Sequence, residues 1–584
     1  MPLYKKAWLL LSNKQKKYAI FIFILMVVAM ILETLSIGIM LPLLSVLLKG
    51  ETNSGFFSYF FIFGYVEDEN LIYVGLAVTF IIFLTKNIFL LFNHWHQSRF
   101  LEKITLELSD KLFKDYLKRD YIFFLQMNTA QLMANVKAEI PSFVEYVNRM
   151  IIFFGEIIIF LGIAILVLYV DFFGTLIILF SIGFFIFLIY AFTKNKIDIY
   201  AKERIIIDRE LNKQLMQGIA TAKDVKILDR EENIIHQFNR NLFKNSTIGL
   251  YMKFIGGLPK FLFEILLVCA FLILVLSMIN MNRDMVSIIQ YLGVFAIASF
   301  RIIPGISRIF TSFQQIKFRQ PTIELLSKEF DPKNYIYAQK NYQSKDLNIP
   351  LKFQKEINLR NLCFSYPIRK EFYLSEISMT IKKGSFIGII GETGSGKSTL
   401  INLFTGLLKP SEGKIEVDEL NIFSNLSEWH KKIGYVPQSI YLTDDTVRKN
   451  IAFGLLENDI DDALVKQAVE KASLSEFLKN LPNGLDTIVG EKGIRISGGQ
   501  QQRIGIARAL YRDPEILILD EATSSLDQLT EKKIIESIQF LKRKKTLIII
   551  THRLATIKDC DKIFFIDKGK ITKQGYPKEI LGNI

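Results

Sequence analysis

The chain has 584 residues, half of which are hydrophobic, and its net charge is +14. A mean hydropathy of +0.27 is high for a soluble protein of this length. The three cysteines lie far apart and form no CxxC pair, which argues against a disulfide framework or a zinc site. No basic patch on a nucleic-acid-binding scaffold accompanies the positive charge. We therefore attribute it to the cytoplasmic face of a membrane protein and expect no nucleic acid partner.

Six apolar segments in the first half are long enough to cross a bilayer, which takes about 20 residues per helix. Backbone polar groups cannot stay unpaired in lipid, so each segment is expected to be helical. The segments are residues 18–48, 71–95, 151–170, 173–192, 254–279 and 286–309. Buried helices of a soluble core are the alternative, and six such runs in one half of a chain argue against it.

The charges beside these spans predict their orientation. Several lysines and no acid precede the first span, and the long connections after the second and fourth spans are basic. We therefore expect both termini and both long connections in the cytoplasm. The connections keep apolar residues at helical spacing, so we expect helices that continue out of the membrane. Their turns, at residues 118–124 and 221–228, are expected to contact the second half of the chain; solvated linkers are the alternative.

Two amphipathic stretches, residues 3–11 and 56–65, are expected to lie on the membrane surface, or else to form tight loops. Ionisable groups inside the spans are costly and make a functional role the default hypothesis. The acidic candidates are Glu33, Glu156 and Glu264. The basic candidates for a substrate cavity are Lys86, Lys260, Arg301 and Arg308. Together they would suit a substrate that carries phosphate. Internal pairing, such as Lys260 with Glu264, or snorkelling to the interface is the alternative.

A polar stretch at residues 327–349 links a transmembrane domain, 1–326, to a second domain, 350–584, in which strand-like and helical runs alternate. An apolar run at 386–390 precedes a match to the phosphate-loop pattern G-x-x-x-x-G-K-[ST], and a helical run from Thr399 follows it. The loop comprises Gly391, Glu392, Thr393, Gly394, Ser395, Gly396, Lys397 and Ser398. Its backbone N–H groups are expected to bind phosphates. Lys397 is expected to reach the β- and γ-phosphates, and Ser398 to bind Mg²⁺.

A second buried strand is predicted at 516–520 and ends in a carboxylate. Asp520 is placed to hold Mg²⁺. Glu521 follows directly and is the candidate base for the attacking water. The pattern is weak by itself and gains its force from the phosphate loop.

Residues 496–500, Ile-Ser-Gly-Gly-Gln, resemble the signature of ATP-binding cassette (ABC) proteins, with Ile in place of the usual Leu. The resemblance covers the C-terminal half and implies roles for three further residues. Tyr366 would stack on adenine, Gln438 would contact Mg²⁺ and the attacking water, and His552 would sense the γ-phosphate. Residues 487–493 resemble a short loop of exporters, and 524–527 resemble the loop that lies across the dimer.

The resemblance also implies a mechanism and an architecture. The fold expected is a multidomain membrane protein, with an all-α six-helix domain of the ABC exporter type before an α/β phosphate-loop domain. Two chains would form a homodimer that encloses two ATP molecules with Mg²⁺. Each site would join the phosphate loop and Thr399 of one chain to the signature of the other. The signature residues concerned are Ser497, Gly498, Gly499 and Gln500.

Three membrane-half segments, 31–43, 257–264 and 300–318, are similar to the flippase of bacterial N-linked protein glycosylation. That resemblance implies a bacterial inner-membrane protein that exports an oligosaccharide linked to undecaprenyl diphosphate. The four basic candidates fall at basic positions of its pattern, with Lys86 and Lys260 where arginine is expected. Export of another lipid, a polysaccharide precursor or a hydrophobic drug is the alternative. A third reading, of another class, is an ATP-driven gate or regulator without a transported substrate.

Overall fold

The computed structural model describes residues 2–40, 43, 68–170, 172–280, 285–331, 350–366, 373–490, 493–521, 536, 541–551 and 553–582. The chain divides into two compact units. One is Met1–Arg119 with Gln126–Tyr335, and the other is Asp120–Leu125 with Ile336–Ile584. Each is described by itself below.

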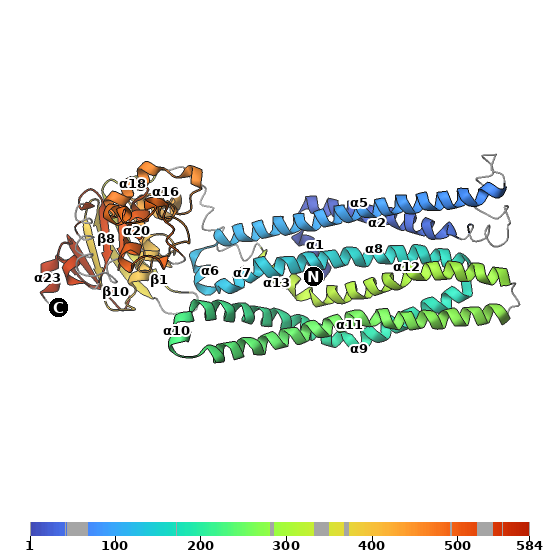
Figure 1. The fold of residues 1–584 in the computed structure, drawn as a ribbon. Coiled ribbons are helices and arrows are strands. Elements are labelled where there is room, and N and C mark those ends of the chain that lie inside the picture. The colour runs from blue at the N-terminus through green and yellow to red at the C-terminus, as the bar shows by residue number, and fades with distance from the viewer. Residues whose placement is uncertain are drawn as a thin grey trace. The chain divides into compact units, whose positions relative to one another are not determined.

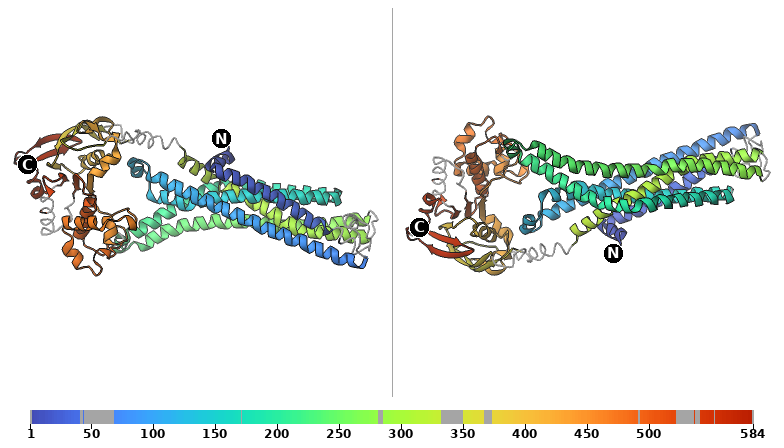
Figure 2. Two further views of the ribbon diagram at one scale, coloured as in Figure 1. Left: turned by 90° about the horizontal axis from the view of Figure 1, so that it is seen from above. Right: turned by 90° about the horizontal axis from the view of Figure 1, so that it is seen from below.

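The first unit is all-helical (Figures 1 and 2). Its long helices are α2 (Asn13–Gly38), α5 (Asp68–Leu117), α8 (Ile140–Val170), α9 (Phe172–Ala220), α11 (Glu231–Asn280) and α12 (Met285–Phe318). Its short ones are α1 (Leu3–Leu10), α7 (Thr129–Ala134), the π-helix η1 (Asn135–Glu139), α10 (Ala222–Ile227) and α13 (Gln320–Glu329). Helix α8 packs against α2 and α12, and α9 packs against α11.

Three of these helices are much longer than a bilayer is thick. Helices α5, α9 and α11 have 50, 49 and 50 residues. At 1.5 Å per residue each is about 75 Å long, against about 30 Å of hydrocarbon. The basic connections predicted between the spans are therefore helical extensions, as their apolar spacing indicates.

Among the described residues, three segments are long and apolar enough to cross a membrane: Asn13–Gly38, Tyr73–Leu117 and Thr129–Leu168. The predicted spans 173–192, 254–279 and 286–309 lie within α9, α11 and α12. The last part of the first predicted span and the aromatic segment 56–65 fall outside the described residues.

The second unit contains two sheets. The antiparallel sheet has the order β2-β1-β4-β5, and the other has the order β10-β9-β3-β8-β7-β6. The first is formed by β1 (Glu356–Phe364), β2 (Leu374–Lys382), β4 (Glu412–Val417) and β5 (Leu420–Asn421). The second is formed by β3 (Phe386–Ile390), β6 (Ile433–Val436), β7 (Ile516–Asp520), β8 (Thr546–Ile550), β9 (Lys562–Asp567) and β10 (Lys570–Gly575). Only β10 runs antiparallel to its neighbour in the second sheet.

Helices flank these sheets. They are α15 (Lys397–Phe404), α16 (Leu426–Lys432), α17 (Val447–Ile451), α18 (Asp462–Lys471), α19 (Ser475–Lys479), α20 (Gly498–Leu510), α22 (Leu554–Ile557) and α23 (Pro577–Leu581). Single 3₁₀ turns are η2 (Ile422–Ser424), η3 (Glu457–Asp459) and η4 (Gly484–Asp486). Every residue of β3, β7 and β8 is buried, as expected for parallel strands covered on both faces.

Alternate side chains of these strands supply two separate cores. Leu517 and Leu519 belong to one, while Ile516 and Ile518 belong to the other. Helix α6 (Tyr121–Gln126) begins in the segment Asp120–Leu125, which the second unit takes in from the first half of the chain. Its Ile122 packs against the core that contains Ile516 and Ile518. The predicted contact of residues 118–124 is therefore observed at Ile122.

Candidate nucleotide site and intramembrane charge cluster

The carboxyl ends of β3, β6 and β7 lie at one edge of the parallel sheet, where ligands bind in open α/β sheets. Each strand leads to a part of the predicted ATP site. The phosphate loop follows β3, Gln438 comes two residues after β6, and Asp520 is the last residue of β7.

The phosphate loop holds backbone conformations that favour glycine. Gly391, Gly394 and Gly396 have φ angles of 155°, 84° and 110°. A Cβ on Gly391 would lie 2.1 Å from the carbonyl oxygen of Ile566, and one on Gly396 would lie 2.6 Å from Leu374. Helix α15 begins at Lys397, within the last two residues of the loop motif, and has no side-chain cap. Its first N–H groups are therefore free for an anion.

Two side chains of the loop fit a phosphate ligand. The hydroxyl of Ser395 is buried and has no hydrogen-bond partner among the described residues. The Lys397 ammonium donates to the carbonyl oxygens of Gly391 and Glu392, at 2.7 and 2.8 Å. Burial lowers the pKa of Lys397, and the nearby Glu521 and Asp520 carboxylates oppose that shift. The loop thus carries a buried hydroxyl that no described residue partners, and a cation bonded to the loop's own carbonyl oxygens.

Asp520 and Glu521 lie side by side in different surroundings. Asp520 is 8% exposed and accepts a hydrogen bond from the Tyr435 hydroxyl at 3.2 Å. Burial raises the pKa of Asp520, the bond from Tyr435 lowers it, and the Glu521 charge raises it. A cation would stabilise this carboxylate. The oxygen atoms of Asp520, Ser398 and Gln438 are of the type that Mg²⁺ prefers, so these residues fit the expected metal.

Glu521 is held by Gln438, although 83 residues separate them in sequence. The Gln438 side-chain amide donates to the Glu521 carboxylate at 2.5 Å. Glu521 has a φ angle of 46°, which is uncommon for a residue with a side chain and is typical of functional sites. Its backbone N–H donates to the carbonyl oxygen of Ile550 at 2.9 Å. The carboxylate is therefore fixed at the sheet edge where a base for water is expected.

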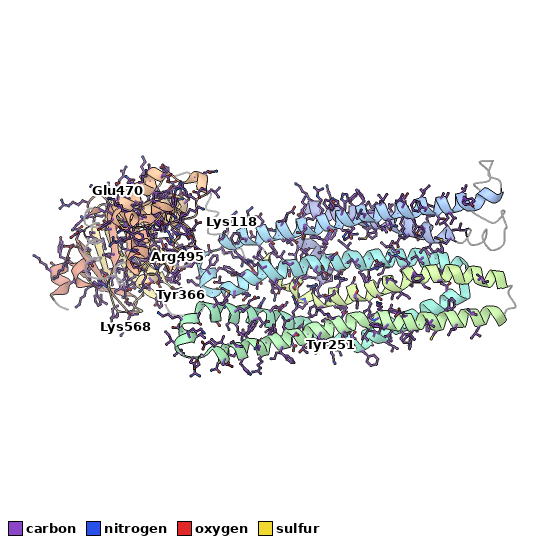
Figure 3. The ribbon with its side chains drawn as sticks, viewed as in Figure 1. Lys118, Tyr251, Tyr366, Glu470, Arg495 and Lys568 are labelled. Atoms are coloured by element: carbon purple, nitrogen blue, oxygen red, sulfur yellow. The ribbon has the colours of Figure 1, made fainter. Side chains whose placement is uncertain are left out.

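Tyr366 lies beside the phosphate loop, and Figure 3 marks its place in this unit. Its hydroxyl is 3.0 Å from that of Thr399, and its ring packs 5.6 Å from the ring of Tyr373. Tyr373 donates to the carbonyl oxygen of Gly394 at 3.2 Å. Sequence reasoning missed Tyr373 and Tyr435, although the latter lies three residues before Gln438.

The signature segment forms the start of α20. Ser497 is the N-cap, and its hydroxyl accepts from the Gln500 N–H at 3.4 Å. The Gln500 side chain in turn accepts from the Ser497 N–H at 2.8 Å. In the described part of the chain, no hydrogen bond joins residues 497–500 to the phosphate loop of the same chain. His552 and residues 524–527 lie outside the described residues.

A cluster of charges joins three helices of the first unit. Arg301 of α12 donates to Glu33 of α2 at 2.6 Å and to Glu156 of α8 at 3.4 Å. Arg308 lies about two turns further along α12, on the same face, and donates to Glu156 at 2.6 Å. Lys86 of α5 lies within electrostatic range of Glu33 and Arg301. The expected cavity cations therefore do not form an unopposed cationic surface, because two carboxylates balance the two arginines.

The alternative of internal pairing thus holds for Arg301 and Arg308, whose partners Glu33 and Glu156 are two of the acidic candidates; the sequence did not indicate which groups pair. The side chains of Glu33 and Glu156 are 7% and 12% exposed, Arg301 is 24% exposed and Arg308 is 43% exposed. Lys260, the fourth candidate, lies on α11 with its ammonium 6.0 Å from the ring of Phe261. The structure brings together Lys86, Arg301 and Arg308.

Part of the second unit matches a known protein family. Residues 374–524, which include the phosphate loop, the signature and Glu521, match the protein-family model described as ABC transporter. A probable multidrug resistance ABC transporter ATP-binding/permease protein of Bacillus subtilis, YheI, is 33% identical over 384 residues. That alignment covers 64% of this chain and 63% of the relative. An ATP-dependent lipid A-core flippase of Pasteurella multocida is 39% identical over 229 residues, which is 39% of each chain.

The chain spans between 17% and 63% of the length of these and the other curated relatives it matches. Over its whole length it resembles the structure of a bacterial Atm1-family ABC exporter with ATP bound. The TM-score is 0.75 at 21% identity, covering 98% of this chain and 97% of the other. The predicted fold class is thereby confirmed. The chain therefore has the fold of that exporter: a helical unit precedes an α/β unit whose match to the ABC transporter model implies ATP binding and hydrolysis with Mg²⁺.

Proposed function

We propose that this chain forms a homodimer in a bacterial inner membrane and couples ATP hydrolysis to the export of a lipid with an anionic head group. The favoured substrate is an oligosaccharide linked to a polyprenyl diphosphate. One observation carries the proposal: the hydrolytic pair Gln438–Glu521 and the phosphate loop occur in one chain with an exporter-type helical domain. Both termini are proposed to lie in the cytoplasm.

The hydrolytic roles follow from the geometry of the ATP site. Glu521, fixed by Gln438, accepts the proton of the attacking water. Lys397 exchanges its two carbonyl partners for the phosphates of bound ATP, whose developing charge it stabilises. Asp520, Ser398 and Gln438 would hold Mg²⁺, which supplies charge neutralisation when bound. His552 is proposed to sense the γ-phosphate, and Tyr366 to stack on the adenine.

A second copy of the chain completes each site in this proposal. The N-terminus of α20, with Ser497 and Gly499, makes no hydrogen bond to its own phosphate loop among the described residues. Helix α20 has 13 residues, and its dipole favours an anion at its N-terminus. We propose that this N-terminus contacts the ATP bound by the partner. Homodimers of this kind contain two equivalent sites, because each chain supplies both halves.

The head-group charge is argued from the intramembrane cluster. Three cations, Lys86, Arg301 and Arg308, meet two carboxylates, which leaves one excess positive charge. Arg308 is the more exposed of the two arginines, and only its Nε pairs with Glu156. A diphosphate can engage the remaining guanidinium donors in bidentate fashion. The name of the Pasteurella relative, a lipid A-core flippase, supports a lipid as substrate.

Export of a hydrophobic drug is the second candidate. The Bacillus relative named for multidrug resistance aligns over 384 residues, which exceeds the length of the second domain and so includes part of the helical domain. Stimulation of ATPase activity distinguishes the substrates. We expect purified protein in lipid nanodiscs to hydrolyse ATP faster when a polyprenyl-diphosphate oligosaccharide is added than when a neutral drug is added. Equal responses to both would contradict the anionic head group, and no response to any lipid would favour the gate or regulator.

A further inference from the structure

An apolar pocket lies beneath the N-terminal helix α1. Tyr4, Ala7, Trp8 and Leu11 line one side of it and recur at helical spacing on one face. Residues from α2, α5 and α8 complete the lining, and all lining residues are apolar or aromatic. The cavity volume is about 370 Å³, within the range of about 300–1,000 Å³ that is typical of ligand sites.

The pocket runs alongside part of a candidate membrane span. Its α2 lining runs from Ala19 to Met26, within the candidate span Asn13–Gly38. Seven residues of helix rise about 10 Å, so the pocket extends by about this depth from the start of the span. Tyr4 and Trp8 are 59% and 44% exposed, although both line the pocket. Exposed Tyr and Trp are typical of the membrane interface, so the pocket begins at the interface and continues into the hydrocarbon.

Five lysines lie close in sequence to the lining residues at the interfacial end of the pocket. Lys5 and Lys6 lie on α1 between lining residues, and three more lysines lie at the start of α2. No described residue forms an ion pair or hydrogen bond with any of these five ammonium groups. The first 17 residues contain no acid. An apolar pocket lined by a helix that also carries lysines is complementary to an amphiphile with a hydrocarbon chain and a negative head group.

We infer that this pocket binds one acyl chain of an anionic membrane phospholipid, with the phosphate at Lys5 and Lys6. The inference rests on the chain spanning a membrane and is independent of which substrate is exported. The site also differs in place from the charge cluster of Arg301 and Arg308. Helix α1 contacts α13 (Gln320–Glu329), the helix that follows α12. A lipid bound under α1 would therefore also stabilise the contact between α1 and α13.

Quenching of Trp8 fluorescence by brominated lipids tests the site directly. The full chain carries Trp95→Phe and is placed in nanodiscs of phosphatidylcholine, with brominated phosphatidylglycerol or brominated phosphatidylcholine added at equal mole fraction. Trp429, the other tryptophan, is fully buried in the α/β unit and serves as the unquenched background. We expect the anionic lipid to quench Trp8 at much lower mole fractions than the zwitterionic lipid does.

Two variants locate the binding. Ala19→Phe places a ring in the pocket and should abolish the selective quenching, whereas Ala77→Phe, at an exposed position of α5, should leave it unchanged. Lys5→Gln with Lys6→Gln should weaken the apparent affinity by roughly 30-fold, since each lysine near an anionic surface contributes about five-fold. The matched control is Lys202→Gln with Lys244→Gln, at exposed positions of α9 and α11.

The ATPase rate of each variant in phosphatidylcholine reports whether the variant is folded. If Ala19→Phe does not fold, the lysine variants still test the site. Equal quenching by the two lipids would overturn the inference. So would selective quenching that survives both Ala19→Phe and the lysine variant. Displacement of the brominated lipid by equimolar export substrate would assign the pocket to the transport path and would also overturn it.

Discussion

Replacing Glu521 with Gln should remove the base for hydrolysis and spare ATP binding. The substitution is isosteric, and a Gln side chain can still bond Gln438 across the 2.5 Å contact. Loss of a positioned base costs about 10²–10⁴ in rate, which corresponds to about 2.7–5.4 kcal/mol in the activation barrier. The Glu521 charge also raises the pKa of Asp520, so its removal makes that metal-binding carboxylate easier to ionise. Binding of Mg²⁺ and ATP should therefore not weaken.

The assay combines two readouts on the purified chain. Phosphate release in a single turnover should fall by the factor above, while the dissociation constant for a fluorescent ATP analogue stays within about two-fold, which is about 0.4 kcal/mol. Glu470→Gln, at an exposed position of α18, is the matched control and should behave as the unmodified chain does. A Glu521→Gln variant that hydrolyses ATP at the full rate would refute the assignment of the base.

Three further predictions follow from the two sites. Arg301→Ala leaves the buried Glu33 without its arginine, while Glu156 keeps Arg308, and should lower stability by about 3–5 kcal/mol. Arg308→Ala, at the more exposed position, should cost about 1 kcal/mol or less; thermal unfolding in detergent compares the two variants. Gly391→Ala would bring a Cβ within 2.1 Å of a carbonyl oxygen and should abolish ATP binding in the same fluorescence assay, unlike Gly249→Ala on α11, where the space is open and the φ angle is not positive. Tyr435→Phe removes a hydrogen bond that lowers the pKa of Asp520, so the pKa rises further. Loss of Mg²⁺-dependent ATP binding on acidification should then begin at higher pH in this variant, as a pH titration of affinity would measure.

The parts of the ATP site that are local in sequence could be predicted from it. The phosphate loop was predictable because a buried strand precedes it and a helix follows it, within about 20 residues. Asp520 and Glu521 were predictable because an apolar run ends in two acids. Their partner Tyr435 was not, since its bond to Asp520 depends on β6 pairing with β7.

In the helical unit, spacing predicted where helices continue and not which side chains meet. The apolar period indicated that the basic connections are helical, and α5 and α11 bear this out. The ion pair of Arg301 with Glu33 joins residues 268 apart, and no local pattern specifies such a partner. The sequence therefore indicated the four cations and the carboxylates Glu33 and Glu156 as intramembrane candidates, but it did not predict that these carboxylates pair with Arg301 and Arg308. For the contact at Ile122, the sequence predicted that the turn at residues 118–124 touches the second half of the chain, but not which side chain makes the contact.

Phosphate release and lipid movement measured together in the same proteoliposomes test the central claim most directly. The vesicles contain a fluorescent polyprenyl-diphosphate oligosaccharide, and its transfer between leaflets is followed by loss of access to an external quencher or lectin. The account predicts that transfer requires ATP and Mg²⁺ and that Glu521→Gln abolishes both hydrolysis and transfer. Transfer that continues without ATP or in the Glu521→Gln variant, or hydrolysis at the full rate with no transfer of any lipid, would contradict it.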